Sequence, residues 1–183
     1  MKRSRHLTLT LMAASVPVML AGCDDGPPTG AVLSSVEQCT STADATAEEC
    51  RAAYANAAAQ HEKLAPRFDD PAQCNEQFGN CSRTRDETGN HWIPPMTGFL
   101  LGYALGGMGS GARYGGSSPL YRDYRSGDYV KPSGDVAANR TGPVTGARGN
   151  TAPPVRAITV SRSGFGSSAA ARSSFGGRGG FGG

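Results

Sequence analysis

The chain has 183 residues, including 26 glycines and 12 prolines, and 38% of its residues are hydrophobic. This length suits one ordinary domain, but the glycine content excludes a chain that packs into a core along its whole length. The formal net charge of +3 is the sum of segments with opposite charge. Residues 24–112 carry a net charge of −7 and residues 113–183 a net charge of +7, which permits attraction between the halves or binding to anionic partners.

Residues 1–22 have the pattern of a secretory signal peptide, with the basic start MKRSRH and the apolar run LTLTLMAASVPVML. Its end, Leu20 to Cys23, resembles the lipobox of bacterial lipoproteins. In that class the cysteine receives diacylglycerol and its new amino group is acylated after cleavage. We therefore predict a covalent diacylglycerol and an N-acyl lipid on Cys23, which anchor the protein to the membrane without a transmembrane helix. An ordinary signal peptide that happens to precede a cysteine is the alternative.

The residues after Cys23 indicate where the anchored protein stays. Asp24 and Asp25 resemble the signal that retains lipoproteins of enteric bacteria in the inner membrane. Residues 23–33 are expected to form a lipidated tether. The sequence thus predicts a protein of the bacterial cell envelope that faces the periplasm, with the inner membrane favoured over the outer.

Residues 34–90 are expected to fold as a small all-α head. Three helix-start patterns lie within it: Ser34-x-x-Glu37, Thr46-x-x-Glu49 and Asp70-Pro71-x-Gln73. The second helix should run from about Ala47 to Ala65 and the third from Pro71 to about Phe78. The buried face of the second helix is expected to be the stripe Cys50, Tyr54, Ala57, His61 and Leu64.

Four cysteines remain after Cys23: Cys39, Cys50, Cys74 and Cys81. An even number in an exported chain predicts two disulfides, which a head with few large apolar residues needs for stability. The local pairs Cys39–Cys50 and Cys74–Cys81 are favoured, with two crossed pairings as alternatives. His61 and His91 could add metal ligands, but no C-x-x-C pair occurs and the compartment is oxidising, so no metal site is predicted.

Residues 91–112 form an apolar, glycine-rich segment. Gly98, Gly102 and Gly106 lie four residues apart, which would place them on one face of a helix and let a second helix approach closely. A helix from Pro95 to Met108 would be about 21 Å long, too short to span a hydrocarbon core of about 30 Å. We expect a short helix that packs against a second copy or an envelope partner through these glycines, or that lies shallowly in the bilayer. A flexible linker is the alternative.

Residues 113–183 are rich in Gly, Ser, Arg, Pro and Thr and are expected to be a long disordered tail. Its end, SSFGGRGGFGG, is of a type that contacts RNA. Export excludes nucleic acid as a partner. The basic charges are therefore expected to meet anionic envelope polymers, lipid headgroups or the acidic head.

Several of these features together resemble the YgiB-like family of bacterial lipoproteins, a domain of unknown function. They are the lipobox, the paired cysteines, and the segments WIPPMTGFLLGYALGG, SSPLYRDYRSGDY and TVSRSGFG. The resemblance covers nearly the whole chain. It implies an envelope lipoprotein without an established activity, sometimes encoded beside an ATP-grasp enzyme similar to glutathionylspermidine synthetases.

The sequence therefore predicts a non-enzymatic envelope lipoprotein with an assembly or interaction role and no cofactor beyond the lipid on Cys23. No catalytic residue is assigned, because no G-x-S-x-G, H-E-x-x-H or phosphate-loop motif occurs. Two alternatives stay open. One is an enzyme or accessory protein in periplasmic thiol or polyamine chemistry, and the other is a module that binds a small ligand.

Overall fold

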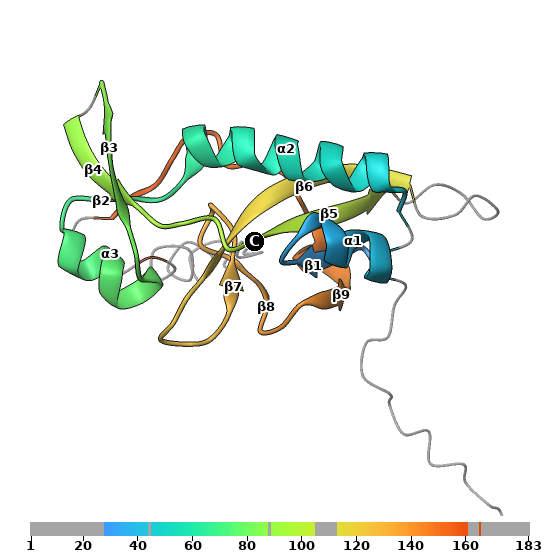
Figure 1. The fold of residues 1–183 in the computed structure, drawn as a ribbon. Coiled ribbons are helices and arrows are strands. Elements are labelled where there is room, and N and C mark those ends of the chain that lie inside the picture. Colours follow the sequence, from blue (N-terminus) through green and yellow to red (C-terminus); the bar gives the residue numbers. More distant parts are fainter. Residues whose placement is uncertain (1–27, 44, 88, 105–112, 161–164, 166–183) are drawn as a thin grey trace, which may run out of the picture.

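The computed structural model describes residues 28–43, 45–87, 89–104, 113–160 and 165. The elements in chain order are β1 (Gly30–Leu33), α1 (Val36–Thr42), α2 (Ala47–Leu64), β2 (Arg67–Phe68), α3 (Pro71–Phe78), β3 (Ser82–Asp86), β4 (Gly89–Ile93), β5 (Gly98–Ala104), β6 (Arg113–Arg122), β7 (Tyr129–Val130), β8 (Val136–Ala138), β9 (Gly142–Val144), the 3-10 helix η1 (Gly146–Gly149) and β10 (Thr159–Val160). Most of these elements are strands in two sheets, so the expected all-α fold is wrong (Figure 1).

The larger sheet is curled and nearly closed. Its strand order is β8-β7-β6-β5-β1-β9, and β1 lies between β5 and β9 in antiparallel register. Val32 of β1 is opposite Leu100 on one side and opposite Gly142 on the other. The two edge strands of the curled sheet are β8 and β9, so its open side lies between them. These two strands also follow one another in the chain.

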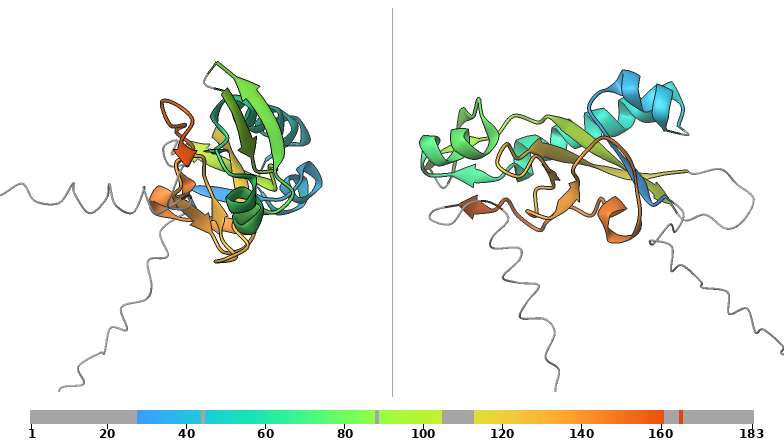
Figure 2. Two further views of the ribbon diagram at one scale, coloured as in Figure 1. Left: turned by 90° about the vertical axis from the view of Figure 1, so that its left-hand side faces the viewer. Right: turned by 90° about the horizontal axis from the view of Figure 1, so that it is seen from below.

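The smaller sheet has the order β10-β2-β4-β3. Phe68 of β2 is opposite Trp92 of β4, and β10 adds in parallel on the other side of β2. Phe78 of α3 packs with Phe68 and with Tyr121. Tyr121 comes from the end of β6, so this apolar core joins the two sheets. Figure 2 shows this sheet and α3 at one end of the molecule and α1 at the other.

The helix α2 runs along the outside of β5 and β6 (Figure 1). Its buried side consists of Cys50, Ala53 and Ala57, and the small side chains let the helix approach the sheet closely. The Ser117 hydroxyl of β6 donates to the Ala53 carbonyl at 2.7 Å. The predicted buried stripe is correct at Cys50 and Ala57, whereas His61 and Leu64 are only half-buried. It is wrong at Tyr54, which is 41% exposed and lies edge to face against the Phe99 ring.

The helices begin where local capping patterns place them. Thr46 and Glu49 form the predicted capping box at the start of α2. At the start of α3, the Asp70 side chain accepts a hydrogen bond from the Ala72 N–H, and Pro71 is the first residue of the helix. At α1 the cap is Ser35 rather than Ser34, because the Ser34 N–H and hydroxyl both donate to the Gln38 side chain.

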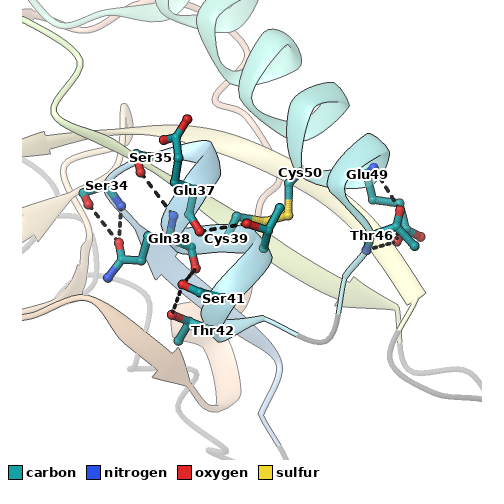
Figure 3. Close-up of a disulfide and its surroundings, with 11 residues drawn as sticks. Ser34, Ser35, Glu37, Gln38, Cys39, Ser41, Thr42, Thr46, Glu49 and Cys50 are labelled. Atoms are coloured by element: carbon teal, nitrogen blue, oxygen red, sulfur yellow. Dashed lines mark hydrogen bonds between the residues drawn. A yellow bond between two sulfur atoms is a disulfide. The ribbon is translucent and has the colours of Figure 1, made fainter.

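Two disulfides connect neighbouring elements, and they are the local pairs that the sequence favours. Cys39–Cys50 joins α1 to the first turn of α2, and both cysteines are fully buried (Figure 3). Cys74–Cys81 joins α3 to the residue before β3.

The predicted helix over residues 95–108 is wrong, because residues 98–104 form β5. Residues four apart share one face in a strand as well as in a helix, so the glycine spacing did not separate the two. A Cβ atom on Gly98 would lie 2.6 Å from the Leu33 carbonyl oxygen, and one on Gly102 would lie 2.8 Å from Thr151 Cγ2. These two glycines therefore allow Leu33 and Thr151 of the same chain to approach β5 closely, and they do not form a surface for a second helix. Gly106 lies outside the described residues.

The predicted disorder of the whole C-terminal part is also wrong. Residues 113–160 contribute β6 to β10, and β6 pairs with β5 along nearly its full length. Residues 30–33, which the sequence places in the tether, form the internal strand β1 between β5 and β9. These segments carry too little apolar surface to fold alone, and they become ordered by pairing with strands far away in the sequence.

Within the described residues, no helix is both long enough and apolar enough to cross a membrane.

Candidate binding site at the open side of the sheet

A cavity of about 350 Å³ lies at the open side of the curled sheet, between β8 and β9. In Figure 1 this region is on the side of the molecule away from α2. Its lining comes from β8, β9, the residues that connect them and the neighbourhood of η1: Asp128, Val136, Ala138, Asn139, Arg140, Thr141, Gly142, Pro143, Val144, Thr145 and Arg148.

The lining combines two exposed arginines, Arg140 and Arg148, with amide and hydroxyl side chains. Asp128 is the one carboxylate among the lining residues. Guanidinium groups offer several N–H donors in a fixed plane, which suits carboxylate and phosphate ligands. The cavity therefore has the donors for an anionic or polyhydroxylated ligand.

A second cavity of about 430 Å³ adjoins the first, since Val136 and Arg148 line both. Its other lining residues are Lys131, Asp135, Ala147 and Asn150. Together the two cavities form a surface between the β7–β8 hairpin and η1 that we call the basic groove, defined by Lys131, Arg140 and Arg148.

Lys131 is the most buried charge in the basic groove, at 7% exposure. Its Nζ donates to the carbonyl oxygens of Asn150 at 3.2 Å and Ala147 at 3.4 Å. These carbonyls belong to η1 and its C-terminal end, where a cation is favourable. Burial lowers the pKa of Lys131, and Asp135 opposes this effect. Lys131 thus fixes η1, which carries Arg148, against the β7–β8 hairpin.

The connection between β8 and β9 is fixed from the other side by Arg122. Its Nη1 donates to the Asn139 carbonyl at 3.1 Å, and its guanidinium carbon lies 4.7 Å from the centre of the Tyr129 ring. Asn139 and Arg140 are neighbours in the chain. The position of Arg140 therefore depends on a contact with the framework of the sheet.

A separate polar cluster lies on the smaller sheet. His91 Nδ1 is 3.2 Å from Asp69 Oδ1, and Asp86 forms an ion pair with Arg67 at 2.6 Å. His91 is 7% exposed. No group of three or more His, Cys, Asp or Glu side chains in the described ranges is arranged to hold a metal ion. The cluster joins β2, β3 and β4, which is a structural role.

A polar pair between α2 and β6 is formed by the half-buried His61 and the buried Tyr121. His61 Nδ1 lies 3.2 Å from the Tyr121 hydroxyl. Burial lowers the pKa of His61 and raises that of Tyr121. Tyr121 is fully buried, so this pair does not face a ligand.

The residues predicted from the sequence as sites do not meet at the basic groove. Cys23 and Gly106 lie outside the described residues, the four later cysteines are in disulfides, and Gly98 and Gly102 are inside the sheet. Sequence reasoning missed Lys131, Arg140 and Arg148 as a group. Their one sequence signal was the positive charge of residues 113–183.

Comparison with known proteins places the chain among proteins without an assigned activity. Residues 28–176 match the family model described as "Protein of unknown function (DUF1190)". A "UPF0441 protein" of Serratia proteamaculans strain 568 is 30% identical, over 94% of this chain and 86% of that protein. A "UPF0441 protein" of Erwinia tasmaniensis is 28% identical, over 91% and 83%. No solved structure gave a significant match.

Proposed function

This chain belongs to the DUF1190 family of proteins of unknown function, and we propose that it is a non-enzymatic, lipid-anchored protein of the bacterial cell envelope. Its partner in this proposal is an anionic envelope polymer that binds in the basic groove. The observation that carries the proposal is the gathering of Arg140 and Arg148 around one cavity at the open side of the sheet.

The anchor is supported by the lipobox-like residues Leu20 to Cys23 and by the resemblance to YgiB-like lipoproteins. Six residues lie between Cys23 and Gly30 at the start of β1, so seven residue steps connect the two. A chain of this length reaches at most about 25 Å. The folded part would therefore stay close to the bilayer, within reach of lipid headgroups and of polymers attached to them.

An anionic ligand is supported by the chemistry of the lining. Arg140 and Arg148 are exposed, and no ion pair within the described part of the chain involves either of them. Their charges are available to a carboxylate or a phosphate. Asn139, Thr141 and Thr145 add groups that suit the hydroxyls of a saccharide.

The backbone next to these arginines is held in place, which supports a role of the two arginines in ligand binding rather than as surface charges without a ligand. Lys131 holds η1 and Arg122 holds Asn139, so both arginines start from positioned segments. A positioned donor loses less conformational freedom when it binds.

The enzymatic alternative has less support. The lining of the basic groove offers no cysteine, histidine or serine that could act as a nucleophile or base beside Asp128 or Asp135. The four cysteines of the described part are held in disulfides. A polyamine is cationic and would be repelled by the two arginines, which disfavours a role in polyamine chemistry.

Binding of defined anionic polymers tests the proposal. Fluorescence anisotropy with oligogalacturonate and with polyphosphate distinguishes carboxylate from phosphate ligands. The double variant Arg140→Gln/Arg148→Gln should bind the preferred probe at least about tenfold more weakly, because each charge-assisted contact is worth about 1.5–3 kcal/mol.

The double variant Arg83→Gln/Arg85→Gln is the matched control, because it removes the same charge from exposed positions on β3. It should retain binding. Equal weakening in both double variants would reduce the effect to net charge and contradict the proposed site. Absence of binding to either probe would contradict the anionic ligand.

A further inference from the structure

The amide side chain of Gln77 makes two hydrogen bonds to the backbone of one distant residue, Phe165. The Phe165 N–H donates to Gln77 Oε1 at 3.0 Å, and Gln77 Nε2 donates to the Phe165 carbonyl at 2.9 Å. The amide thereby makes the same pair of hydrogen bonds that the backbone of a neighbouring antiparallel strand would make. Both residues are buried, Gln77 at 4% and Phe165 at 6% exposure.

The Gln77 side chain is fixed before Phe165 reaches it. Its Nε2 also donates to Asp123 Oδ2 at 2.7 Å, and Asp123 is itself 8% exposed. The other carboxylate oxygen of Asp123 accepts from the backbone N–H groups of Arg125 and Ser126. Asp123 therefore determines the orientation in which the Gln77 amide presents its oxygen to an incoming N–H.

An apolar contact accompanies the two hydrogen bonds. The ring of Phe165 meets the ring of Phe78 edge to face, with centroids 5.8 Å apart. Gln77 and Phe78 are consecutive at the end of α3, so one helix end supplies both the backbone and the ring recognition. Gln77, Phe78 and Asp123 define what we call the phenylalanine clamp.

The clamp contacts both the backbone and the ring of a phenylalanine that precedes a glycine. The sequence contains further Phe-Gly dipeptides after Phe165. Phe165, Phe175 and Phe181 are each followed by glycine, and they are the three phenylalanines of the last 19 residues. Phe165 is the first of them after β10 and fills the clamp of its own chain. Residues 173–183 carry the two further copies of the same dipeptide.

We propose that the phenylalanine clamp is a binding site for Phe-Gly segments and that residues 173–183 of a second copy of this chain are its intermolecular occupant. An empty clamp would leave the Gln77 amide buried without its two backbone partners, which is unfavourable. Any Phe-Gly segment that supplies the same N–H, carbonyl and ring relieves this cost. Exchange of Phe165 for a neighbour's segment makes a head-to-tail contact, and such contacts extend into chains of copies.

A labelled peptide of residues 173–183 tests the clamp directly. Phe165→Ala removes the tethered ring from the clamp and leaves only the backbone groups of residue 165 as competitors. This variant should therefore bind the peptide at least about tenfold more tightly than wild type, in which the complete tethered Phe165 competes at high effective concentration. The peptide with both phenylalanines changed to alanine is the control ligand. The chain with Phe165→Ala and Gln77→Ala together should bind neither peptide.

The emission of Trp92, which packs against the same core, reports whether each variant is folded. The proposal is overturned if a folded Phe165→Ala chain does not bind the peptide 173–183, or if it binds this peptide and the alanine control peptide equally.

A second measurement keeps the wild-type clamp intact in case Phe165→Ala does not fold. A photoreactive phenylalanine at position 181 of the full chain is mixed with isotope-labelled wild type and illuminated. Crosslinks from the probe to residues 71–78 of the labelled copy are expected, and excess unlabelled peptide 173–183 should suppress them. Crosslinks confined to the same copy, or to other regions of the labelled copy, overturn the intermolecular part of the proposal.

Discussion

The ammonium group of Lys131 lies 3.2 Å from the Asn150 carbonyl oxygen and carries its charge into a site with 7% exposure. No carboxylate neutralises it at hydrogen-bond distance among the described contacts, since its two partners are backbone carbonyls. A charge buried in this way costs stability, and an apolar residue of similar length can replace it at little cost. The lysine is therefore better explained by the position it gives to η1 and Arg148 than by stability.

We predict that Lys131→Met changes the free energy of unfolding by no more than about 1 kcal/mol, because relief of desolvation offsets the lost hydrogen bonds. The same variant should weaken anion binding at the basic groove, since η1 loses its attachment. Urea unfolding and anisotropy on one preparation separate the two effects. A large loss of stability with unchanged binding would assign Lys131 a purely structural role.

The pH dependence of this variant follows from the lowered pKa of Lys131. In the unfolded chain the group titrates near its ordinary value of 10.5, whereas in the folded chain it loses its proton at lower pH. Between these values the unfolded state binds more protons, so wild-type stability rises with pH relative to Lys131→Met. Tyr121, whose pKa is raised by burial, lowers the stability of both proteins in alkali and cancels in the difference. Urea unfolding from pH 8 to 10 should show the two proteins diverging.

His61 should make the fold sensitive to acid. Burial lowers its pKa below the ordinary value of 6.5, so the unfolded state binds the proton first as the pH falls. The stability that His61 contributes is present above about pH 6.5 and is lost as the pH falls below it. His61→Gln keeps a polar partner for the Tyr121 hydroxyl but does not titrate.

Thermal unfolding between pH 7.5 and 5 should therefore show a smaller decrease in Tm for His61→Gln than for wild type. His91→Gln, at the histidine of β4 in the smaller sheet, is the comparison. A decrease of the same size in wild type and His61→Gln would show that other groups cause the acid sensitivity.

The Cys39–Cys50 disulfide is expected to contribute strongly to stability. It joins α1 to α2 in the core, and neither cysteine has exposed surface. The paired replacement Cys39→Ala/Cys50→Ala should lower the free energy of unfolding by about 2–4 kcal/mol. Urea unfolding measures this, and wild type in reductant should approach the variant. An unchanged midpoint in both experiments would contradict the prediction.

Local signals in the sequence were sufficient for the helices but not for the sheets. Thr46 with Glu49, and Asp70 with Pro71, act within one turn, so the starts of α2 and α3 could be predicted. The strand β6 has no such signal, because Ser117, Ser118 and Pro119 break the alternation typical of a strand. Ser117 is explained by Ala53 of α2, whose carbonyl accepts its hydroxyl. That partner is 64 residues away in the sequence.

The candidate sites were missed for the same reason. Lys131, Arg140 and Arg148 are unremarkable in a segment rich in glycine and proline, and only the closure of the sheet from β1 to β9 gathers them. Gln77 of the phenylalanine clamp is one of several polar residues on a short helix. Its importance depends on Phe165, which lies 88 residues further along the chain.

The role of Gly102 can be tested inside the fold. A Cβ atom at this position would lie 2.8 Å from Thr151 Cγ2, so Gly102→Ala should lower stability by about 1–3 kcal/mol through overpacking. Thr151→Ala removes the atoms in the way, and the double variant should recover most of the loss. A double-mutant cycle in urea measures this coupling. Additive effects of the two changes would contradict the close approach of Gly102 and Thr151.

The proposed lipid anchor makes a prediction that does not depend on the fold. Cys23→Ser removes the thiol that would be acylated, so the variant should lose incorporation of a clickable palmitate analogue and keep its signal peptide. Cys81→Ser leaves the lipobox-like residues intact and should be labelled like wild type. Asp24→Ser/Asp25→Ser should keep the label but move the protein from the inner to the outer membrane fraction in an enteric host. Labelling that persists in Cys23→Ser would contradict the anchor, whereas unchanged fractionation of the aspartate variant would contradict only its location. Because the folded part would begin within about 25 Å of the proposed anchor, loss of the lipid would also remove the basic groove from the membrane surface on which the proposed function depends.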